Sequence, residues 1–117
     1  MEISAIGNRE DPDPLGPLFV ALADPTRRRI IERLRDREQT VSELAHGLDI
    51  GAPSVSKHLT VLEHAGLVSR QREAQWRRCR LEAIAFERLQ QWLDHYAQLW
   101  PGSLDRLETH LRSKEAR

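Results

Sequence analysis

The apolar residues near the middle of the chain recur at the period of an α-helix. Val55, Leu59 and Leu62 are spaced by four and then three residues, which places them on one face of a helix. Pro53 suits the first turn, where its missing N–H is no loss, and a glycine just past the last turn is a natural stop. The pattern therefore predicts a helix over residues 53–65.

The opposite face of this predicted helix is small and polar and carries one cation. In a chain with 31% charged residues, a merely solvated face would usually carry pairs of glutamate and lysine. Short hydroxyl side chains and one lysine instead allow close approach to phosphates and base edges. We therefore predict a DNA recognition helix whose contacts come from Ser54, Ser56, Lys57, Thr60 and Val61.

Two further helices are predicted before it. Asp24 is a capping acid followed by proline at the first helical position, and helical periodicity continues to about Arg37. Thr40, with Glu43 three residues on, has the form of a capping box that opens a short helix over 41–48. A short turn joins that helix to the polar-faced helix, so the two together indicate a helix-turn-helix.

After Gly66 the pattern changes to the alternation of two short strands, 67–73 and 76–81. The Ala74-Gln75 turn between them lacks the Asn-Gly or Asp-Gly of a good tight turn. Arginines on a hairpin beside a recognition helix can straddle phosphates or the minor groove. The predicted fold is mainly α with a small β-hairpin, a winged helix-turn-helix, and the predicted hairpin contacts to DNA are Arg70, Arg72, Arg77 and Arg78.

Both ends of the chain carry more apolar surface than a small winged domain can bury. Residues 15–23 are nearly all apolar, and a wide apolar stripe follows Glu82 until Pro101-Gly102 kinks or ends that helix. We expect a homodimer through the terminal helices; the rival is a monomer whose C-terminal helix folds back over the core. The predicted interface consists of Leu18, Phe19, Leu22, Leu89, Trp92, Leu93, Tyr96, Trp100, Leu104 and Leu107.

Length and composition are those of one small domain. We expect a domain over residues 15–113, with a flexible arm at 1–14 and a frayed tail at 114–117. Mean hydropathy is −0.59, no apolar run approaches a membrane span, and the N-terminus lacks the pattern of a signal peptide. A lone cysteine fits a reducing compartment and excludes a zinc site built from several cysteines. We therefore expect a cytoplasmic protein with no membrane partner.

Charge is balanced overall but not locally. The 18 basic and 18 acidic side chains cancel, whereas residues 66–81 carry five arginines against one glutamate. A local basic patch in a neutral protein marks a local footprint for an anionic partner. The arginine triplet 27–29 has two readings, phosphate contact or a solvated face balanced by nearby acids, and the second is favoured.

Two motifs together resemble the ArsR-type winged-helix repressors of bacteria. The first is Ala-Leu-Ala-Asp-Pro-Thr-Arg-Arg-Arg-Ile at 21–30, and the second is Val-Ser-Lys-His-Leu-Thr-Val-Leu-Glu-His-Ala-Gly-Leu-Val at 55–68. The resemblance implies a dimeric regulator that binds a palindromic operator in double-stranded DNA and often represses its own promoter. It assigns DNA contact to positions 54, 56, 57 and 60. His58 also matches the motif, but we favour a packing or hydrogen-bonding role for it.

The metal motifs of that family are missing from this chain. Where many relatives carry a Cys-x-Cys pair, residues 42–46 contain no cysteine, and Asp94-His95-Tyr96 breaks the spacing of the other common site. We therefore predict no metal, no cofactor and a metal-independent regulator. A non-standard site across a dimer, built from His95, His110, Asp94 and Glu108, is the less favoured alternative. An inducing small molecule or protein is left open.

Cys79 and Trp76 each allow two roles, and two other classes of function compete with DNA binding. Cys79 fits a small buried packing residue better than a redox switch, which needs an exposed thiol of low pKa. Trp76, near the hairpin tip, either covers the hairpin or stacks against a sugar.

A winged-helix module for protein interaction would carry an apolar or acidic patch on residues 54–61, unlike the face present. We expect no enzyme, since no catalytic triad, carboxylate pair or phosphate-binding loop is evident.

Overall fold

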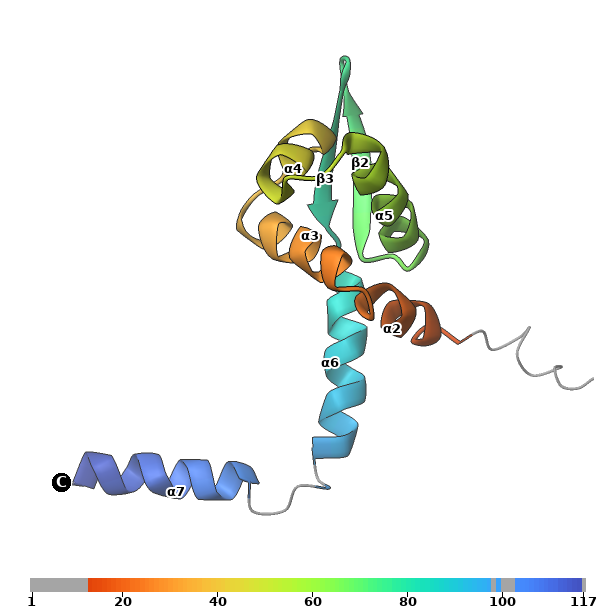
Figure 1. Cartoon of the computed structure of the whole chain (residues 1–117). Coiled ribbons are helices and arrows are strands. Elements are labelled where there is room, and N and C mark those ends of the chain that lie inside the picture. Colours follow the sequence, from red (N-terminus) through yellow and green to blue (C-terminus); the bar gives the residue numbers. More distant parts are fainter. Residues whose placement is uncertain (1–12, 98, 100–102, 117) are drawn as a thin grey trace, which may run out of the picture.

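The computed structural model describes residues 13–97, 99 and 103–116, with the side chains of 103–107, 115 and 116 left out. The predicted arm therefore lies almost wholly outside the described residues, and the expected break at Pro101-Gly102 lies there too. The elements, labelled as in Figure 1, are α2 (Gly16–Leu22), α3 (Pro25–Asp36), β1 (Gln39–Thr40), α4 (Val41–Leu48), α5 (Ala52–His64), β2 (Val68–Glu73), β3 (Trp76–Leu81), α6 (Ala83–Ala97) and α7 (Ser103–Ala116).

The helix starts form as the sequence predicts. The Asp24 side chain accepts a hydrogen bond of 3.0 Å from the backbone N–H of Arg27, and Pro25 occupies the first helical position of α3. Thr40 and Glu43 complete a capping box at α4, with bonds of 2.8 and 3.1 Å between each side chain and the other's backbone N–H. These caps fix where α3 and α4 begin.

The core is built from one stripe of each helix in the helix-turn-helix. Val55, Leu59 and Leu62 of α5 are completely buried, which confirms the apolar stripe of that helix. They pack with buried residues from α2, α3, α4 and the hairpin, namely Leu18, Ala21, Ile30, Leu34, Leu44, Leu48, Leu67, Val68 and Cys79. Burial of this stripe leaves the polar face of α5 turned outward.

The sheet contains a strand that the sequence analysis missed. β1 pairs antiparallel with β3, so the sheet has three strands in the order β1-β3-β2. Gln39 is buried there, and its side-chain amide donates to the carbonyl of Arg33 at 2.9 Å. A two-residue strand with two buried polar residues carries no alternation that a sequence pattern could reveal.

The hairpin of β2 and β3, called the wing below, projects beyond α4 and α5 (Figure 1). Its strands pair from Val68 opposite Leu81 to Glu73 opposite Trp76. The two-residue turn between them holds Ala74 at φ +55°, a left-handed conformation that L-residues with a side chain disfavour. The turn lacks the Asn-Gly or Asp-Gly that suits such a conformation, so an alanine adopts it with strain.

The terminal helices are only partly covered by the rest of the chain. In α2, Leu18 and Ala21 are buried, whereas Phe19 and Val20 are exposed, so only one face of this helix is buried within the chain. In α6, Ala85 is buried and Phe86 and Leu89 pack on the core, after which the helix runs away from the winged body (Figure 1). None of the described helices is long and apolar enough to cross a membrane.

Candidate nucleic-acid interface

The outer face of α5 presents most of the predicted contact residues to solvent. Ser54, Lys57 and Thr60 are exposed, whereas Ser56 and Val61 are half-buried. The helix positions these side chains because its opposite stripe is fixed in the core, leaving little freedom of rotation about its axis. A polar face held rigidly on a helix is the geometry by which proteins read the major groove.

Arg70 lies between the wing and α5 rather than on the outer surface. Only 12% of its side chain is exposed, and its Nη2 and Nε donate to Oε1 of Glu63 at 2.7 and 2.9 Å. Nη1 donates to Oγ of Ser56 at 3.2 Å, and Nη2 donates to Oγ1 of Thr60 at 3.1 Å. The guanidinium therefore joins the first half of strand β2 to the polar face of α5.

Arg72 and Arg77 point outward from the wing and face each other. They are direct cross-strand partners, and both are exposed. Like charges directly opposite on a sheet destabilise it unless an anion lies between or near them. A pocket of about 260 Å³ opens beside this pair, between the wing and α5, and it is lined by Glu63, Arg70, Arg72 and Arg77.

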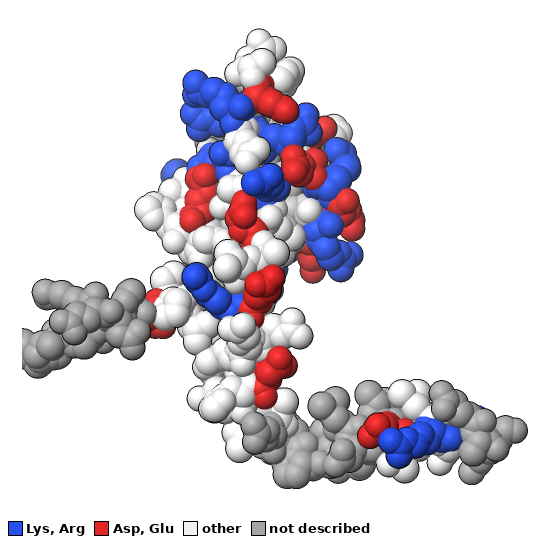
Figure 2. All heavy atoms as spheres, turned by 180° about the vertical axis from the view of Figure 1, so that it is seen from behind, with Lys and Arg blue, Asp and Glu red and all other residues white. Residues whose placement is uncertain are grey.

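Arg78 belongs to the other face of the wing, because successive side chains of a strand alternate. Its Nε lies 3.3 Å from a carboxylate oxygen of Glu73. The sequence analysis grouped Arg77 with Arg78, and the structure separates them onto opposite faces. Basic side chains gather around the wing end of the molecule, with acidic side chains among them (Figure 2).

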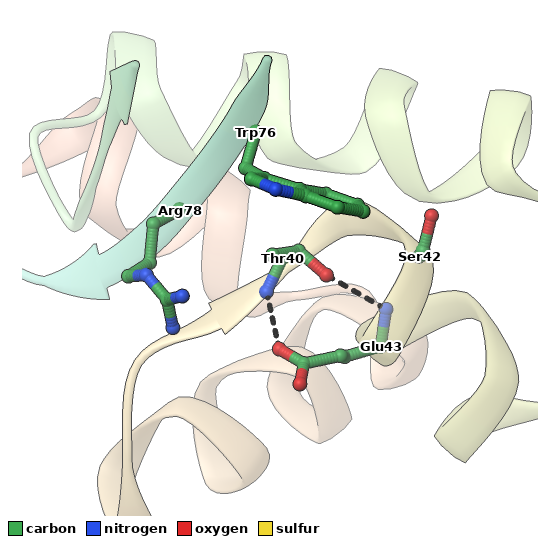
Figure 3. Close-up of a pocket in the computed structure, with 5 residues that line it drawn as sticks. All are labelled: Thr40, Ser42, Glu43, Trp76 and Arg78. Carbon is green, nitrogen blue, oxygen red and sulfur yellow. Dashed lines mark hydrogen bonds between the residues drawn. The ribbon is translucent and has the colours of Figure 1, made fainter. Parts of the chain in front are cut away.

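Trp76 covers the start of α4. Its indole lies over Thr40 and reaches toward Ser42, while 52% of the residue remains exposed (Figure 3). With Glu43 and Arg78, these residues line a pocket of about 300 Å³. Backbone bonding to Thr40 is the main cause that lowers the pKa of Glu43 below its usual range, so the carboxylate stays ionised. The indole therefore covers the start of α4, a contact that neither of the two roles left open by the sequence included, and stacking against a sugar stays a prediction.

Two arginines of the triplet 27–29 bind backbone carbonyls of their own chain. Arg27 donates to the carbonyls of Ala21 and Val20 at 2.7 and 3.0 Å, and Arg28 donates to the carbonyl of Leu22 at 2.6 Å. These bonds satisfy the exposed C-terminal end of α2 and hold it against α3. They give the triplet a structural role that neither reading of the sequence included.

His58 has an internal hydrogen-bonding partner. Its Nδ1 lies 3.3 Å from Nη1 of Arg27 and 3.9 Å from a carboxylate oxygen of Asp24. The backbone N–H of Arg27 is the main cause that lowers the pKa of Asp24, with His58 adding a smaller electrostatic effect. The favoured hydrogen-bonding role of His58 therefore matches the structure, and it links α5 to the start of α3.

Cys79 is a buried packing residue. It is completely buried in the core, and burial raises the pKa of its thiol to about 11. A thiol in that environment is protonated at neutral pH and reacts slowly with oxidants, because the thiolate is the reactive species. The packing role is the one that the structure supports.

The predicted dimer residues form a partly exposed surface on α2 and α6. Phe19 meets Trp92 edge to face with ring centroids 5.3 Å apart, and Trp92 lies 4.8 Å from Tyr96. Phe19, Trp92, Leu93 and Tyr96 are 37–52% exposed. We call this set the aromatic surface; in Figure 2 the lower body along α6 carries few charges.

The other predicted interface residues divide into two groups. Leu18 is 1% exposed and packs in the core of its own chain, so its side chain has no free surface for a partner. Leu22 and Leu89 are half-buried against the same core. The side chains of Trp100, Leu104 and Leu107 lie outside the described residues.

Metal-binding side chains do not converge within the described part of the chain. No group of three or more His, Cys, Asp or Glu residues there is arranged to hold an ion. His110 and Glu108 are exposed on α7, and Asp94 and His95 are exposed on α6.

The Glu63–Arg70 pair is the site feature that the sequence reasoning missed. The two residues lie on different elements, joined through a turn in which Gly66 adopts φ +82°. Their spacing of seven residues carries no signal unless the geometry of that turn is known. A weak hint was available, because Glu63 is the single acid on a helix face otherwise free of acids before the wing.

Comparison with known proteins agrees with this geometry. A family model described as a helix-turn-helix domain matches residues 22–71. The transcriptional repressor SdpR of Bacillus subtilis is 37% identical over 59 residues, which cover 50% of this chain and 66% of SdpR. The chain spans roughly half to two thirds of the length of such curated relatives.

Two solved structures extend the similarity over most of the chain. The crystal structure of an ArsR family transcriptional regulator is 39% identical, with a TM-score of 0.69, and covers 76% of this chain and 92% of its own. An ArsR-like transcriptional regulator from Rhodococcus sp. RHA1 is 25% identical, with a TM-score of 0.70, and covers 97% of this chain and 98% of its own. The fold is therefore a winged helix-turn-helix, as predicted.

Proposed function

Because the chain belongs to the ArsR family of helix-turn-helix transcriptional regulators, we propose that it is a homodimeric repressor of a palindromic operator in double-stranded DNA. Proteins of this family are regulators and not enzymes. In the proposed complex, α5 lies in the major groove and the wing lies against the neighbouring backbone. Autorepression of its own promoter is the simplest circuit for such a protein.

The observation that carries this proposal is the exposed Arg72–Arg77 pair beside the polar face of α5. Two facing cations are stabilised by an anion, and a DNA phosphate is the anion that lies beside a helix seated in the major groove. Glu63 also lines the pocket beside the two arginines, but its carboxylate is paired with Arg70. Lys57 adds a third exposed cation on α5 itself. Ser54, Ser56, Thr60 and Val61 then face base edges and thymine methyl groups.

The dimeric state rests on the aromatic surface. Large side chains such as Trp92 and Phe19 remain 37% and 43% exposed in the single chain, and a second copy would remove them from water. A twofold axis through this surface gives two copies of α5, which suits a palindromic operator with half-sites on the order of 34 Å apart. We therefore propose that dimerisation and operator symmetry go together.

We further propose that metal ions do not control DNA binding. The helix that carries paired cysteines in many relatives reads Ser-Glu-Leu-Ala-His at residues 42–46, and Cys79 is buried in the core. These residue types leave no thiolate pair near α4.

Mobility shift with the protein's own upstream DNA tests the function. The assay is run at about 50 and 200 mM salt, with and without zinc and with a chelator. A specific shift that weakens steeply with salt and ignores metal supports the proposal, since phosphate contacts release counterions. Release of the DNA by zinc would overturn metal independence. Absence of any specific shift, there or with a pool of random duplexes, would favour a protein-interaction module.

A further inference from the structure

The four hydrogen bonds of Arg70 determine what two hydroxyl groups on α5 can still do. A serine or threonine hydroxyl has one hydrogen to donate and two lone pairs to accept with. Oγ of Ser56 accepts from Arg70 at 3.2 Å. Its own hydrogen and its second lone pair remain unused among the described contacts, so Ser56 can still donate and accept.

The hydroxyl of Thr60 has fewer hydrogen-bonding options left than that of Ser56. Its hydroxyl donates to the backbone carbonyl of Ser56 at 3.1 Å, which uses its only hydrogen. It also accepts from Nη2 of Arg70 at 3.1 Å. One lone pair remains, so Thr60 can only accept a hydrogen bond from an incoming group.

The charge of Arg70 is already balanced. Oε1 of Glu63 lies 2.7 Å from its Nη2 and 2.9 Å from its Nε, and the Arg70 side chain is only 12% exposed. A cation paired in this way releases no counterion when DNA binds nearby, unlike the exposed Arg72. Arg70 is therefore better placed to orient the hydroxyl groups of Ser56 and Thr60 than to contact a phosphate.

We propose that Arg70 is a positioning residue that holds the hydroxyl groups of Ser56 and Thr60 in place on α5 and leaves Thr60 only an acceptor toward DNA. This rests on the proposed function, since it concerns how the same surface reads an operator. Ser56 keeps a hydrogen and a lone pair, so its hydroxyl can pair with any of the four bases in the major groove. A base opposite Thr60 carries an exocyclic amine, which restricts it to adenine or cytosine.

The test compares the sequences that variants select from a pool of random duplexes, together with the salt dependence of binding to the wild-type consensus. Arg70→Met removes the guanidinium but keeps a long apolar stem, and Arg72→Met is the matched control on the same face of the same strand. Ser56→Ala and Thr60→Val identify the base positions that each hydroxyl reads. Thermal unfolding of every variant verifies that it is folded.

We expect Arg70→Met and Arg72→Met to change different properties of DNA binding. Arg70→Met relaxes discrimination by roughly fivefold or more at the positions that Thr60→Val also relaxes, while the salt slope stays as in the wild type. Arg72→Met keeps the consensus and lowers the salt slope by about one. Glu63→Gln weakens the hold on Arg70, so it relaxes the same positions and steepens the slope, because the charge of Arg70 is no longer balanced.

Other results overturn the inference. If Arg70→Met lowers the salt slope by about one and keeps the consensus, Arg70 is a phosphate contact. If Arg70→Met does not fold, Glu63→Gln decides, and an unchanged consensus with that variant rejects the positioning role. If the wild-type protein enriches no sequence at all, the proposed function itself fails and the inference fails with it.

Discussion

The basic side chains around α5 and the wing differ in what they face. Lys57, Arg72 and Arg77 are exposed, whereas Arg70 is paired with Glu63 inside the groove between the two elements. Residue type and strand alternation could predict that arginines gather on the wing. They could not predict which arginine turns inward, because that depends on how the Gly66 turn sets the wing against α5.

Lys57→Ala tests the exposed cation on α5. We expect weaker binding to all duplexes and a salt slope that is smaller by about one, because one phosphate contact is lost. The measurement is the affinity for specific and random duplexes over a series of salt concentrations. Lys114→Ala, an exposed lysine on α7, is the control and should leave both quantities unchanged. An unaltered slope for Lys57→Ala would show that this lysine does not contact phosphate.

The buried thiol of Cys79 gives a prediction about reactivity and pH. Its pKa is raised to about 11 from an unfolded value near 9.0, so the folded state holds its proton more tightly than the unfolded state. The associated stability is complete below pH 9 and is lost as pH rises from 9 toward 11. A thiol reagent at pH 8 should label Cys79 only at the rate of unfolding. Rapid labelling of the folded protein would contradict its burial.

At the scale of elements, the helices were the most predictable part of the fold. α3 and α4 begin where Asp24 and Thr40 cap them, since a cap needs only a side chain and a backbone N–H three residues away. β1 was missed because its pairing with β3 is a contact distant in sequence. The wing was predicted from alternation, but its turn geometry was not.

Ala74→Gly tests the strain in that turn. Alanine at φ +55° costs about 1–2 kcal/mol in a left-handed conformation, and glycine avoids this cost at an entropic penalty of about 0.5–1 kcal/mol. We expect the variant to be more stable by up to about 1 kcal/mol in urea unfolding. Gln75→Gly, at the adjacent position, is the matched control and should be neutral or destabilising. Equal or lower stability for Ala74→Gly would argue that the turn is unstrained.

At the scale of the whole molecule, the described residues leave the aromatic surface partly exposed to solvent. The aromatic surface on α2 and α6 was predicted from helical periodicity, since more apolar positions were present than one small core can bury. Periodicity could not tell that Leu18 packs inside its own chain. That distinction depends on which face of α2 meets α3 and α5.

Trp92→Glu tests the proposed dimer. A charge among Phe19, Tyr96 and their copies would remain desolvated on association. We therefore expect the variant to sediment as a monomer at micromolar concentration, where we expect the wild type to sediment as a dimer. Trp76→Glu, which alters an exposed tryptophan on the wing, is the control and should remain dimeric. If Trp92→Glu stays dimeric, the aromatic surface is not the interface.

Hydroxyl-radical footprinting on the duplex that the wild-type chain selects is the most direct test of a dimeric repressor bound to a palindromic operator. We predict two protected regions related by twofold symmetry, with centres on the order of 34 Å apart, as two copies of α5 in successive major grooves require. We also predict protection of the backbone beside each region, where Arg72 and Arg77 of the wing would lie. A single unsymmetrical region, or protection that does not depend on sequence, would contradict a dimeric operator-binding repressor.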